Sequence, residues 1–245
     1  MFRRSSSKAK YPVTSCKSLF SRKDSSSYNP ESRPARLSNA RVWAYEPYLP
    51  AAWGRRMPWG MTDEICQRVF PFTPLSHLQA NLPDILQVAT ATRADRVMFL
   101  MALATVRAET ESFVPCAEQV SRFNTSSGGT PFDLYDRRAD LGNQGPPDGE
   151  RYRGRGYVQL TGRFNYNRLG PRISLDLITS PELAAESYPA ARLLFCFLNA
   201  RGEQLHKAAA EGNLAQARRL VNGGSHGLDR FCDAYRIADS LLENA

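Results

Sequence analysis

The stretch "TRADRVMFLMALATVRAET", residues 92–110, carries the strongest helical pattern in the chain. From Val97 to Ala104 the apolar residues recur at the i, i+3, i+4 and i+7 spacing of a single helix face. Thr92 is the candidate N-cap of this helix. The pattern predicts a buried helix that runs directly into the carboxyl group of Glu109, and burial at such a position raises the pKa of a carboxyl group.

Helical patterns continue on both sides of this stretch. Thr62 is placed to cap "DEICQRV", and Asn213 is placed to cap "LAQARRLVN", which ends at Gly223. The apolar segment "PAARLLFCFLNAR" predicts a helix that stops at Gly202. Residues 112–155 are rich in turn formers and predict a long loop region with one short hairpin at most. We therefore expect a mainly α-helical (α+β) fold with a small lobe of loops and a hairpin.

The net positive charge of the chain comes from its first 60 residues. Residues 1–60 hold twelve lysines and arginines against three acidic residues, whereas residues 61–245 hold twenty against twenty-one. The first segment is also rich in serine and lacks the apolar core of a secretory signal. We expect 1–60 to be a basic, disordered tail and linker, of which residues 43–60 either pack on the domain or remain a linker. Residues 61–245 are the expected folded domain, and without a signal peptide the protein would stay in the cytoplasm until release or leave by a non-classical route.

Several classes of protein are disfavoured by what the chain contains. The five cysteines are widely spaced without a Cys-x-x-Cys motif, which favours free, mostly buried thiols and leaves one disulfide as the alternative. The three histidines share no metal-ligand spacing, so we expect no metal site and no cofactor. No apolar run approaches the length of a membrane span. We expect a monomer.

Three glutamates follow the strongest helix within ten residues. Glu109 and Glu111 are about 200° apart on a helix, so only one of them can face a given cleft, and Glu109 lies nearer the buried face. Glu118 lies beyond Pro115 on a new segment that the fold can bring opposite Glu109. Two carboxylates on either side of a substrate are the basic equipment of glycoside hydrolysis. The alternative is that all three are solvated charges at a helix end.

The segment "RYRGRGYVQLTGRFNY", residues 151–166, carries a second chemical signal. Gly154 and Gly156 predict a tight turn that leads into an extended segment. There Gln159 and Thr161 would project to one face, where they can hold a water or a sugar hydroxyl. The alternative is a nucleic-acid contact, but the excess positive charge lies elsewhere in the chain and the arginine-glycine unit occurs only twice.

Together three segments resemble the family-19 glycoside hydrolases, which include chitinases and related endolysins. They are "AETESF" (108–113), "RGRGYVQLTGRFNY" (153–166) and "VNGGSHGLDR" (221–230), in the same order as in that family. The resemblance covers about residues 61–245. It implies a lysozyme-like fold and inverting hydrolysis of β-1,4-linked N-acetylhexosamine polymers of the chitin type.

The resemblance also assigns roles to individual residues. Glu109 matches the general acid, Glu118 the base that activates water, and Thr161 the residue that positions this water. The substrate-contacting positions that it implies are Gln159, Asn165, Tyr157 and Asn222.

This sequence departs from the family pattern in two places. Ala108 stands where many members have histidine, and Glu111 replaces a small residue, so that its charge can raise the pKa of Glu109 if the two remain close. The second catalytic carboxylate has alternatives at Asp133, Asp136 and Asp140.

Three functional hypotheses follow from these patterns. The first is a glycoside hydrolase whose polysaccharide substrate is chitin or, alternatively, the glycan of peptidoglycan, as for an endolysin that degrades cell walls. The second is a catalytically impaired glycan-binding protein of the same fold. The third, disfavoured by the charge distribution, is a nucleic-acid-binding protein.

Overall fold

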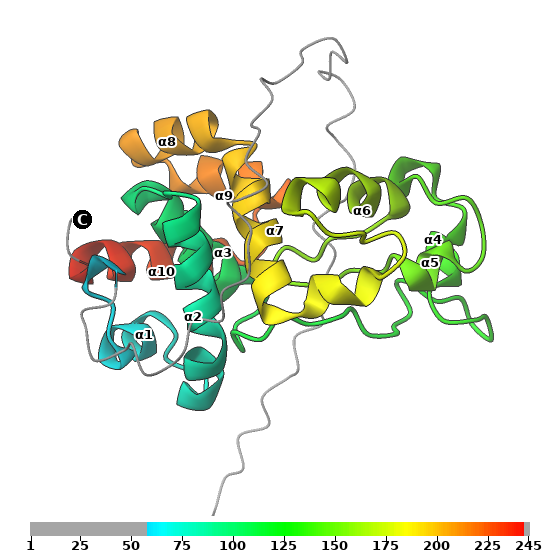
Figure 1. The fold of residues 1–245 in the computed structure, drawn as a ribbon, viewed down its shortest axis with the longest axis horizontal. Helices are drawn as coiled ribbons and strands as arrows, with labels where there is room; N and C mark the ends of the chain where they lie inside the picture. The colour runs from blue at the N-terminus through cyan, green and yellow to red at the C-terminus, as the bar shows by residue number, and fades with distance from the viewer. Residues whose placement is uncertain (1–57, 243–245) are drawn as a thin grey trace, which may run out of the picture.

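The computed structural model describes residues 58–242, and these are mainly helical, as the sequence predicts. Figure 1 shows a larger helical lobe that contains α1, α2, α3, α8, α9 and α10, and a smaller lobe that contains α4, α5 and α6. The long helix α7 runs between the two lobes (Figure 1). The α-helices are α1 Asp63–Val69, α2 Leu75–Ala91, α3 Arg96–Glu109, α4 Asp133–Asp136, α5 Asp148–Arg151, α6 Arg163–Leu169, α7 Ser187–Asn199, α8 Gly202–Ala210, α9 Leu214–Asn222 and α10 Leu228–Leu241. The 3-10 helices are η3 Pro58–Gly60, η4 Ala139–Leu141, η5 Pro171–Ile173 and η6 Pro181–Ala185.

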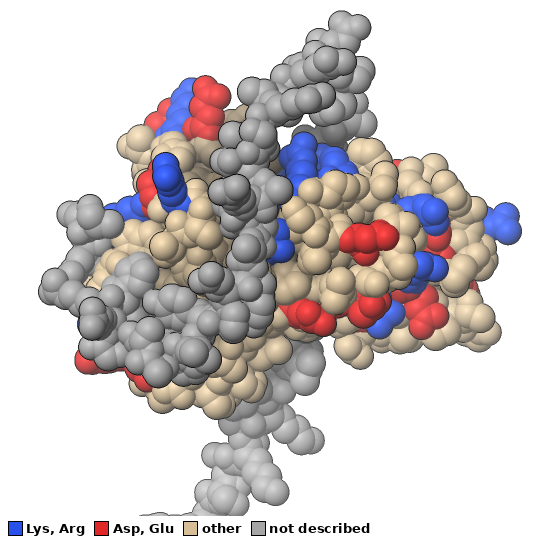
Figure 2. Space-filling model, in the orientation of Figure 1, with Lys and Arg blue, Asp and Glu red and all other residues tan. Residues whose placement is uncertain are grey.

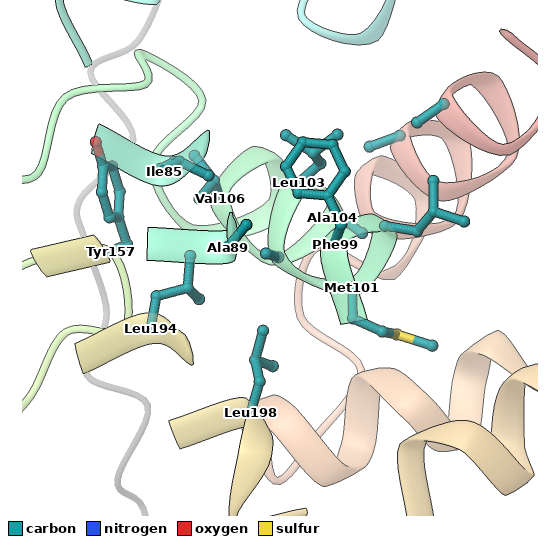
Figure 3. Packing of buried hydrophobic residues seen from close by; sticks show 14 of the residues in the cluster. Ile85, Ala89, Phe99, Met101, Leu103, Ala104, Val106, Tyr157, Leu194 and Leu198 are labelled. Carbon is teal, nitrogen blue, oxygen red and sulfur yellow. The ribbon is translucent and has the colours of Figure 1, made fainter. Parts of the chain in front are cut away.

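Helix α3 is the centre of the larger lobe. It packs against α10, α7 and α8, and every residue from Met98 to Ala108 is buried. Figure 3 shows side chains of α2, α3 and α7 together in one hydrophobic cluster. The helix begins later than predicted, because Asp95 rather than Thr92 accepts the capping hydrogen bond, from the Met98 N–H at 2.9 Å. Thr92 instead ends α2, and a left-handed residue after it turns the chain toward α3.

Helix α7 joins two hydrophobic cores. Leu194 and Leu198 belong to the large core with α2 and α3, whereas Leu193 belongs to a second core in the smaller lobe. Because both sides of α7 are buried, the two lobes share one structural element. The second core consists of Tyr152, Leu160, Tyr166, Leu169, Ile173, Leu177, Ala184 and Leu193.

The predicted end signals of α1 and α9 are confirmed, and that of α7 is not. Thr62 accepts a hydrogen bond from the Ile65 N–H at 3.2 Å and caps α1. Asn213 caps α9, which ends at Gly223 with a left-handed φ of 70°. The prediction that Gly202 stops α7 is wrong, because α7 ends at Asn199 and Gly202 is the first residue of α8.

The smaller lobe is a set of short helices and turns. The region 112–155 contains α4, η4 and α5, which the sequence did not predict. The hairpin is reduced to one antiparallel bridge between Arg155 and Leu160, and Ala117 forms a second bridge with Arg155. Among residues 58–242 the structure has no named strand, so the β content of the lobe is confined to these bridges.

The described chain starts with η3, which contacts α3. Trp59 stacks on Phe99 of α3 with ring centroids 4.2 Å apart. The predictions for residues 1–57 lie outside the described residues. Four cysteines, Cys66, Cys116, Cys196 and Cys232, lie in the described part and are not joined to one another by disulfide bonds, and Cys16 lies outside that part. Between residues 58 and 242 no helix has the length and apolar character needed to cross a membrane.

Candidate active site

Glu109 is the last residue of α3 and lies against a buried arginine. Its side chain is 4% exposed, and the Arg218 side chain, which donates a hydrogen bond to Glu109 Oε1, is fully buried. Arg218 is itself held by its Nε, which donates to the His226 carbonyl at 2.8 Å. The ion pair thus joins the end of α3 to α9 and to the turn that precedes α10.

Burial and the neighbouring positive charges shift the pKa of Glu109 in opposite directions. Burial raises the pKa of this carboxyl group, and the guanidinium groups of Arg218 and Arg230 oppose the rise without cancelling it. The net result is a carboxyl group that keeps its proton to a higher pH than an exposed glutamate does. A general acid requires this property.

The two departures from the family pattern have structural explanations. Glu111 lies beyond the end of α3, where Arg230 Nη1 lies 2.9 Å and Arg107 Nε lies 3.6 Å from its carboxylate. It is not among the charges that shift the pKa of Glu109, so the possible repulsion between the two glutamates is not realised. A Cβ added at Gly227 would lie 3.4 Å from the Ala108 Cβ, so this turn packs closely on the small side chain.

Glu118 is a second buried carboxylate and is held by neutral donors. Its Oε1 accepts from the Tyr135 hydroxyl at 2.9 Å and from Asn124 Nδ2 at 3.1 Å. The Gly154 N–H lies 3.2 Å from Oε2, and the Glu118 N–H donates to the Gly154 carbonyl at 2.7 Å. The backbone around Glu118 is thereby fixed to the glycine turn that the sequence singled out.

Three side-chain oxygens converge at Gly154. A Cβ built on this residue would lie 2.8 Å from Gln159 Oε1 and 3.2 Å from both Glu118 Oε2 and Thr161 Oγ1. The Thr161 hydroxyl donates to the Gln159 carbonyl at 2.8 Å, so its lone pairs remain available to another donor. The Gln159 Oε1 atom is buried and accepts no hydrogen bond from the described residues. Each oxygen of this oxygen cluster around Gly154 can therefore accept a further hydrogen bond.

The turn after Gly154 differs from the extended segment that the sequence predicts. Gln159 has a left-handed φ of 48°, which closes the four-residue turn between Arg155 and Leu160. Val158 and Leu160 are buried in different cores and form no common face, whereas Gln159 Oε1 and Thr161 Oγ1 both lie near Gly154, on one side as predicted. The Gln159 Nε2 donates to the carbonyls of Gly156 at 3.0 Å and of Cys116 at 3.1 Å, which fixes its amide oxygen toward the cluster.

The remaining predicted site residues differ in their contacts and burial. Asn165 on α6 is buried and donates to the Thr161 carbonyl at 2.8 Å. Asn222 is the last residue of α9, and its Nδ2 lies 3.4 Å from the His226 carbonyl oxygen. The same carbonyl accepts the hydrogen bond from Arg218 Nε. Tyr157 is fully buried in the large core, as Figure 3 shows, so the structure gives it a packing position rather than the exposed one a substrate contact needs.

The alternative second carboxylates are engaged in local contacts. Asp133 accepts from the Ser126 N–H at 2.7 Å, and Asp136 accepts from the Gly149 N–H at 2.8 Å. Asp140 forms an ion pair with Arg138. Glu118, by contrast, lies at the oxygen cluster with Thr161 and Gln159.

Sequence reasoning missed the residues that hold the two glutamates. For Arg218 a signal was present, because it shares the buried face of α9 with Leu214, Ala217 and Val221, and an arginine there requires an anionic partner. No local pattern marks Tyr135 or Asn124, because their contacts depend on how the loops of the smaller lobe fold back.

A pocket of about 330 Å³ lies beside α6 and η5. None of the predicted site residues is among its lining residues. The residues that line the pocket are Tyr166, Asn167, Pro171, Ser174, Leu175, Asp176, Leu177 and Ile178.

Comparison with known proteins gives the following relationships. The chain is 27% identical over 103 residues to a glycosyl hydrolase family 19 domain-containing protein from Haemophilus influenzae, a match that covers 42% of this chain and 48% of the relative. The chain thus spans about half the length of that relative. No family model matches.

Among solved structures, chitinase C from Streptomyces griseus has 18% identity and a TM-score of 0.49, over 75% of this chain and 77% of that one. A mutant of a chitinase C has 17% identity and the same TM-score, over 75% and 78% of the two chains. The sequence match is thus to a protein named for the family that the three motifs indicate.

Proposed function

We propose that this protein is an inverting glycoside hydrolase that cleaves β-1,4-linked N-acetylhexosamine polymers. In this proposal Glu109 is the general acid and Glu118 is the general base. The observation that carries the proposal is the pair of buried glutamates in contrasting surroundings, one with a raised pKa and one at a cluster of oxygen acceptors. Such a contrast divides acid and base roles between two carboxyl groups.

The proposed reaction needs one proton donor and one proton acceptor. Glu109 gives its proton to the glycosidic oxygen as the bond from that oxygen to C1 breaks. Glu118 takes a proton from a water that attacks C1 on the opposite face of the sugar. The net result is hydrolysis with inversion, so that a β-linked substrate releases an α-anomer first.

The oxygen cluster around Gly154 supports a place for this water beside Glu118. A water there can donate one hydrogen to Glu118 Oε2 and the other to Thr161 Oγ1, whose own proton is already given to the Gln159 carbonyl. Its lone pair then remains free for attack on C1. Because glycine leaves out a Cβ at the centre of these oxygens, Gly154 supplies the space.

For the substrate we propose a chitin-type polymer, with the glycan of peptidoglycan as the second candidate. Both polymers present β-1,4 links and N-acetyl groups, and the motifs do not distinguish them. Catalysis by residues 58–242 as one domain, without a metal or cofactor, is part of the proposal.

The test measures hydrolysis of chitin oligosaccharides by product analysis and of purified cell walls by loss of turbidity. The wild type and the variants Glu109→Gln and Glu118→Gln are compared, with Glu111→Gln as the matched control. We expect cleavage of at least one substrate by the wild type and by the control, and a loss of about a thousandfold in both other variants.

Proton NMR of the first product of an oligosaccharide reports the anomer directly. An α-anomer is expected. A β-anomer as first product, inactivity of the wild type on both substrates, or full activity of Glu109→Gln would overturn the mechanism. Tight binding without cleavage would instead identify a glycan-binding protein.

A further inference from the structure

The chain bends sharply just after Glu109, the proposed general acid. Helix α3 ends there, and Phe113, four residues later, has a left-handed φ of 58°. A bulky residue is strained in this backbone conformation and keeps it only where its surroundings hold it. Phe113 is fully buried, and its N–H donates to the Thr110 carbonyl at 2.6 Å, which closes the bend. The bend therefore depends on contacts with the rest of the molecule.

Those contacts come from the corner between α1 and α2, which we name the corner segment, residues 69–77 (Figure 1). Arg107, in the last turn of α3, donates a hydrogen bond from Nη1 to the Val69 carbonyl. The Thr73 hydroxyl donates to the Glu111 carbonyl. Both donating side chains are buried, so these two hydrogen bonds are shielded from water.

Two further contacts of the corner segment complete the clamp. His77 Nδ1 lies 3.0 Å from the Ser112 carbonyl oxygen, and because a carbonyl can only accept, this nitrogen is the donor. The Phe70 ring meets the Phe113 ring edge-on, with centroids 4.7 Å apart and planes at 87°. The corner segment thus holds four positions within residues 107–113, before and after the proposed acid.

A clamp at this place matters because helix ends fray. Glu109 is the last residue of α3, so its carboxyl group moves with any opening of the final turn. A general acid must stay within hydrogen-bond reach of the oxygen that it protonates, and a misplacement of about 1 Å can cost about a hundredfold in rate. Arg218 binds the carboxyl group, whereas the corner segment holds the backbone on either side of it.

Charges on the molecular surface are mixed on the face drawn in Figure 2. Basic and acidic side chains are interspersed over the described part of this face. The fields of such mixed charges largely cancel, and salt screens them beyond a Debye length of about 8–10 Å. From this face Glu109 therefore receives no strong long-range field, and direct contacts decide its orientation.

We propose that the corner segment positions the general acid, with Thr73 and His77 as positioning residues that hold the end of α3. The inference rests on the proposed function and adds two residues that lie outside all three motifs. Both act through the backbone that carries Glu109. Their removal therefore slows proton donation to the leaving group and leaves substrate binding unchanged.

The central test is Thr73→Val, which removes the hydroxyl group and keeps the shape of the side chain. Thr105→Val is the matched control, because Thr105 is also buried and its hydroxyl donates to a carbonyl, that of Met101 at 2.7 Å, within α3 itself. Thr73→Ser is the conservative variant that retains a hydroxyl group. Steady-state kinetics are measured for each on a chitin oligosaccharide and on an activated aryl glycoside, whose leaving group needs no proton.

We expect Thr73→Val to lose about tenfold in kcat on the oligosaccharide with KM within about twofold, and to lose little on the aryl glycoside. Thr73→Ser and Thr105→Val should stay within about twofold of the wild type on both substrates. A purely structural role would lower the activity of Thr73→Val on both substrates alike, and this result would overturn the inference. Equal losses in Thr73→Val and Thr105→Val would also contradict it.

His77→Leu tests the same clamp at a half-buried side chain, and it replaces Thr73→Val if that variant does not fold. Loss of the contact with the Ser112 carbonyl should reduce kcat about threefold on the oligosaccharide and leave hydrolysis of the aryl glycoside unchanged. Unchanged kcat on the oligosaccharide would show that the corner segment does not act on the acid.

NMR titration of the Glu109 carboxyl carbon tests the inference without turnover. Burial raises the pKa of Glu109, and a loosened helix end lets water reach the carboxyl group. Thr73→Val should therefore lower this pKa toward the ordinary value, whereas Thr105→Val should leave it unchanged. An unchanged pKa in Thr73→Val would refute the inference. A lowered pKa there, in a protein whose wild type hydrolyses neither substrate, would overturn the proposed function and leave the clamp on Glu109 standing.

Discussion

The two buried glutamates are held in opposite ways. Glu109 ends a long helix of the larger lobe and pairs with the buried cation Arg218. Glu118 lies in a loop of the smaller lobe and is bound by an amide, a phenol and a backbone N–H. A charged partner and burial set the protonation of the first, whereas neutral donors fix the orientation of the second.

The difference shows how one chain can give two carboxyl groups different properties, a raised pKa in one and a fixed orientation in the other. Burial without sufficient compensation raises the pKa of Glu109, although an arginine lies beside it. Three donors on Glu118 point its Oε2 toward the oxygen cluster around Gly154. The same residue type therefore receives different properties from a helix end and from a loop.

The largest expected effect separates the two roles by the leaving group. Glu109→Gln should lose about a thousandfold in kcat on an ordinary glycan and regain much of it on a substrate whose leaving group needs no protonation. Glu118→Gln should lose a similar factor on both substrates, because the water still lacks its base. Steady-state kinetics on an oligosaccharide and on an activated aryl glycoside measure this. Identical behaviour of the two variants would show that the roles are not divided as proposed.

Removal of the buried cation Arg218 has the next largest expected effect, and this effect is on stability. Arg218→Met should lower the free energy of unfolding by about 3 kcal/mol at neutral pH, because it leaves a buried carboxylate without its partner. The double variant Glu109→Gln with Arg218→Met should be more stable than the sum of the single effects predicts. Urea unfolding of the four proteins measures the coupling. Simple additivity would mean that the ion pair contributes nothing specific.

A methyl group at the oxygen cluster should have a smaller effect, on the side of Glu118 alone. Gly154→Ala places a Cβ 2.8 Å from Gln159 Oε1 and should reduce kcat about tenfold or more with little change in KM. Gly202→Ala is the matched control, because a Cβ at Gly202 meets no atom within 4 Å. Kinetics and thermal unfolding of both variants are compared. Equal activity in the two would show that Gly154 does not keep space for the reaction.

The smallest expected effect is the contribution of Glu109 to the pH dependence of the free energy of unfolding. Its folded pKa lies above the ordinary value of 4.5, so the folded state holds a proton that the unfolded state has already lost. The resulting stabilisation is complete below pH 4.5 and is lost as pH rises through the folded pKa. The difference in unfolding free energy between wild type and Glu109→Gln should therefore fall as pH rises over this window. A difference that grows with pH would mean that the ion pair, rather than burial, dominates.

The prediction from sequence was most successful where the signal is local. Thr62, Asn213 and Gly223 act as predicted because a cap needs only the next few residues. It failed at Thr92, because Asp95 caps α3 instead, and at Gly202, because α7 already ends at Asn199. For the site, the sequence selected both glutamates and the glycine turn, and their proposed roles await the experiments above.

By itself the sequence determined that a buried helix ends at Glu109, that the net positive charge lies in residues 1–60, and that three motifs follow one another in the family order. Periodicity, composition and motif order are properties of the chain and need no packing. Only the tertiary structure decided that Arg218 pairs with Glu109, that Tyr157 lies in the core, and that three oxygens meet at Gly154. Those contacts join residues far apart in the chain, and only the packing of the helices and loops on one another selects them.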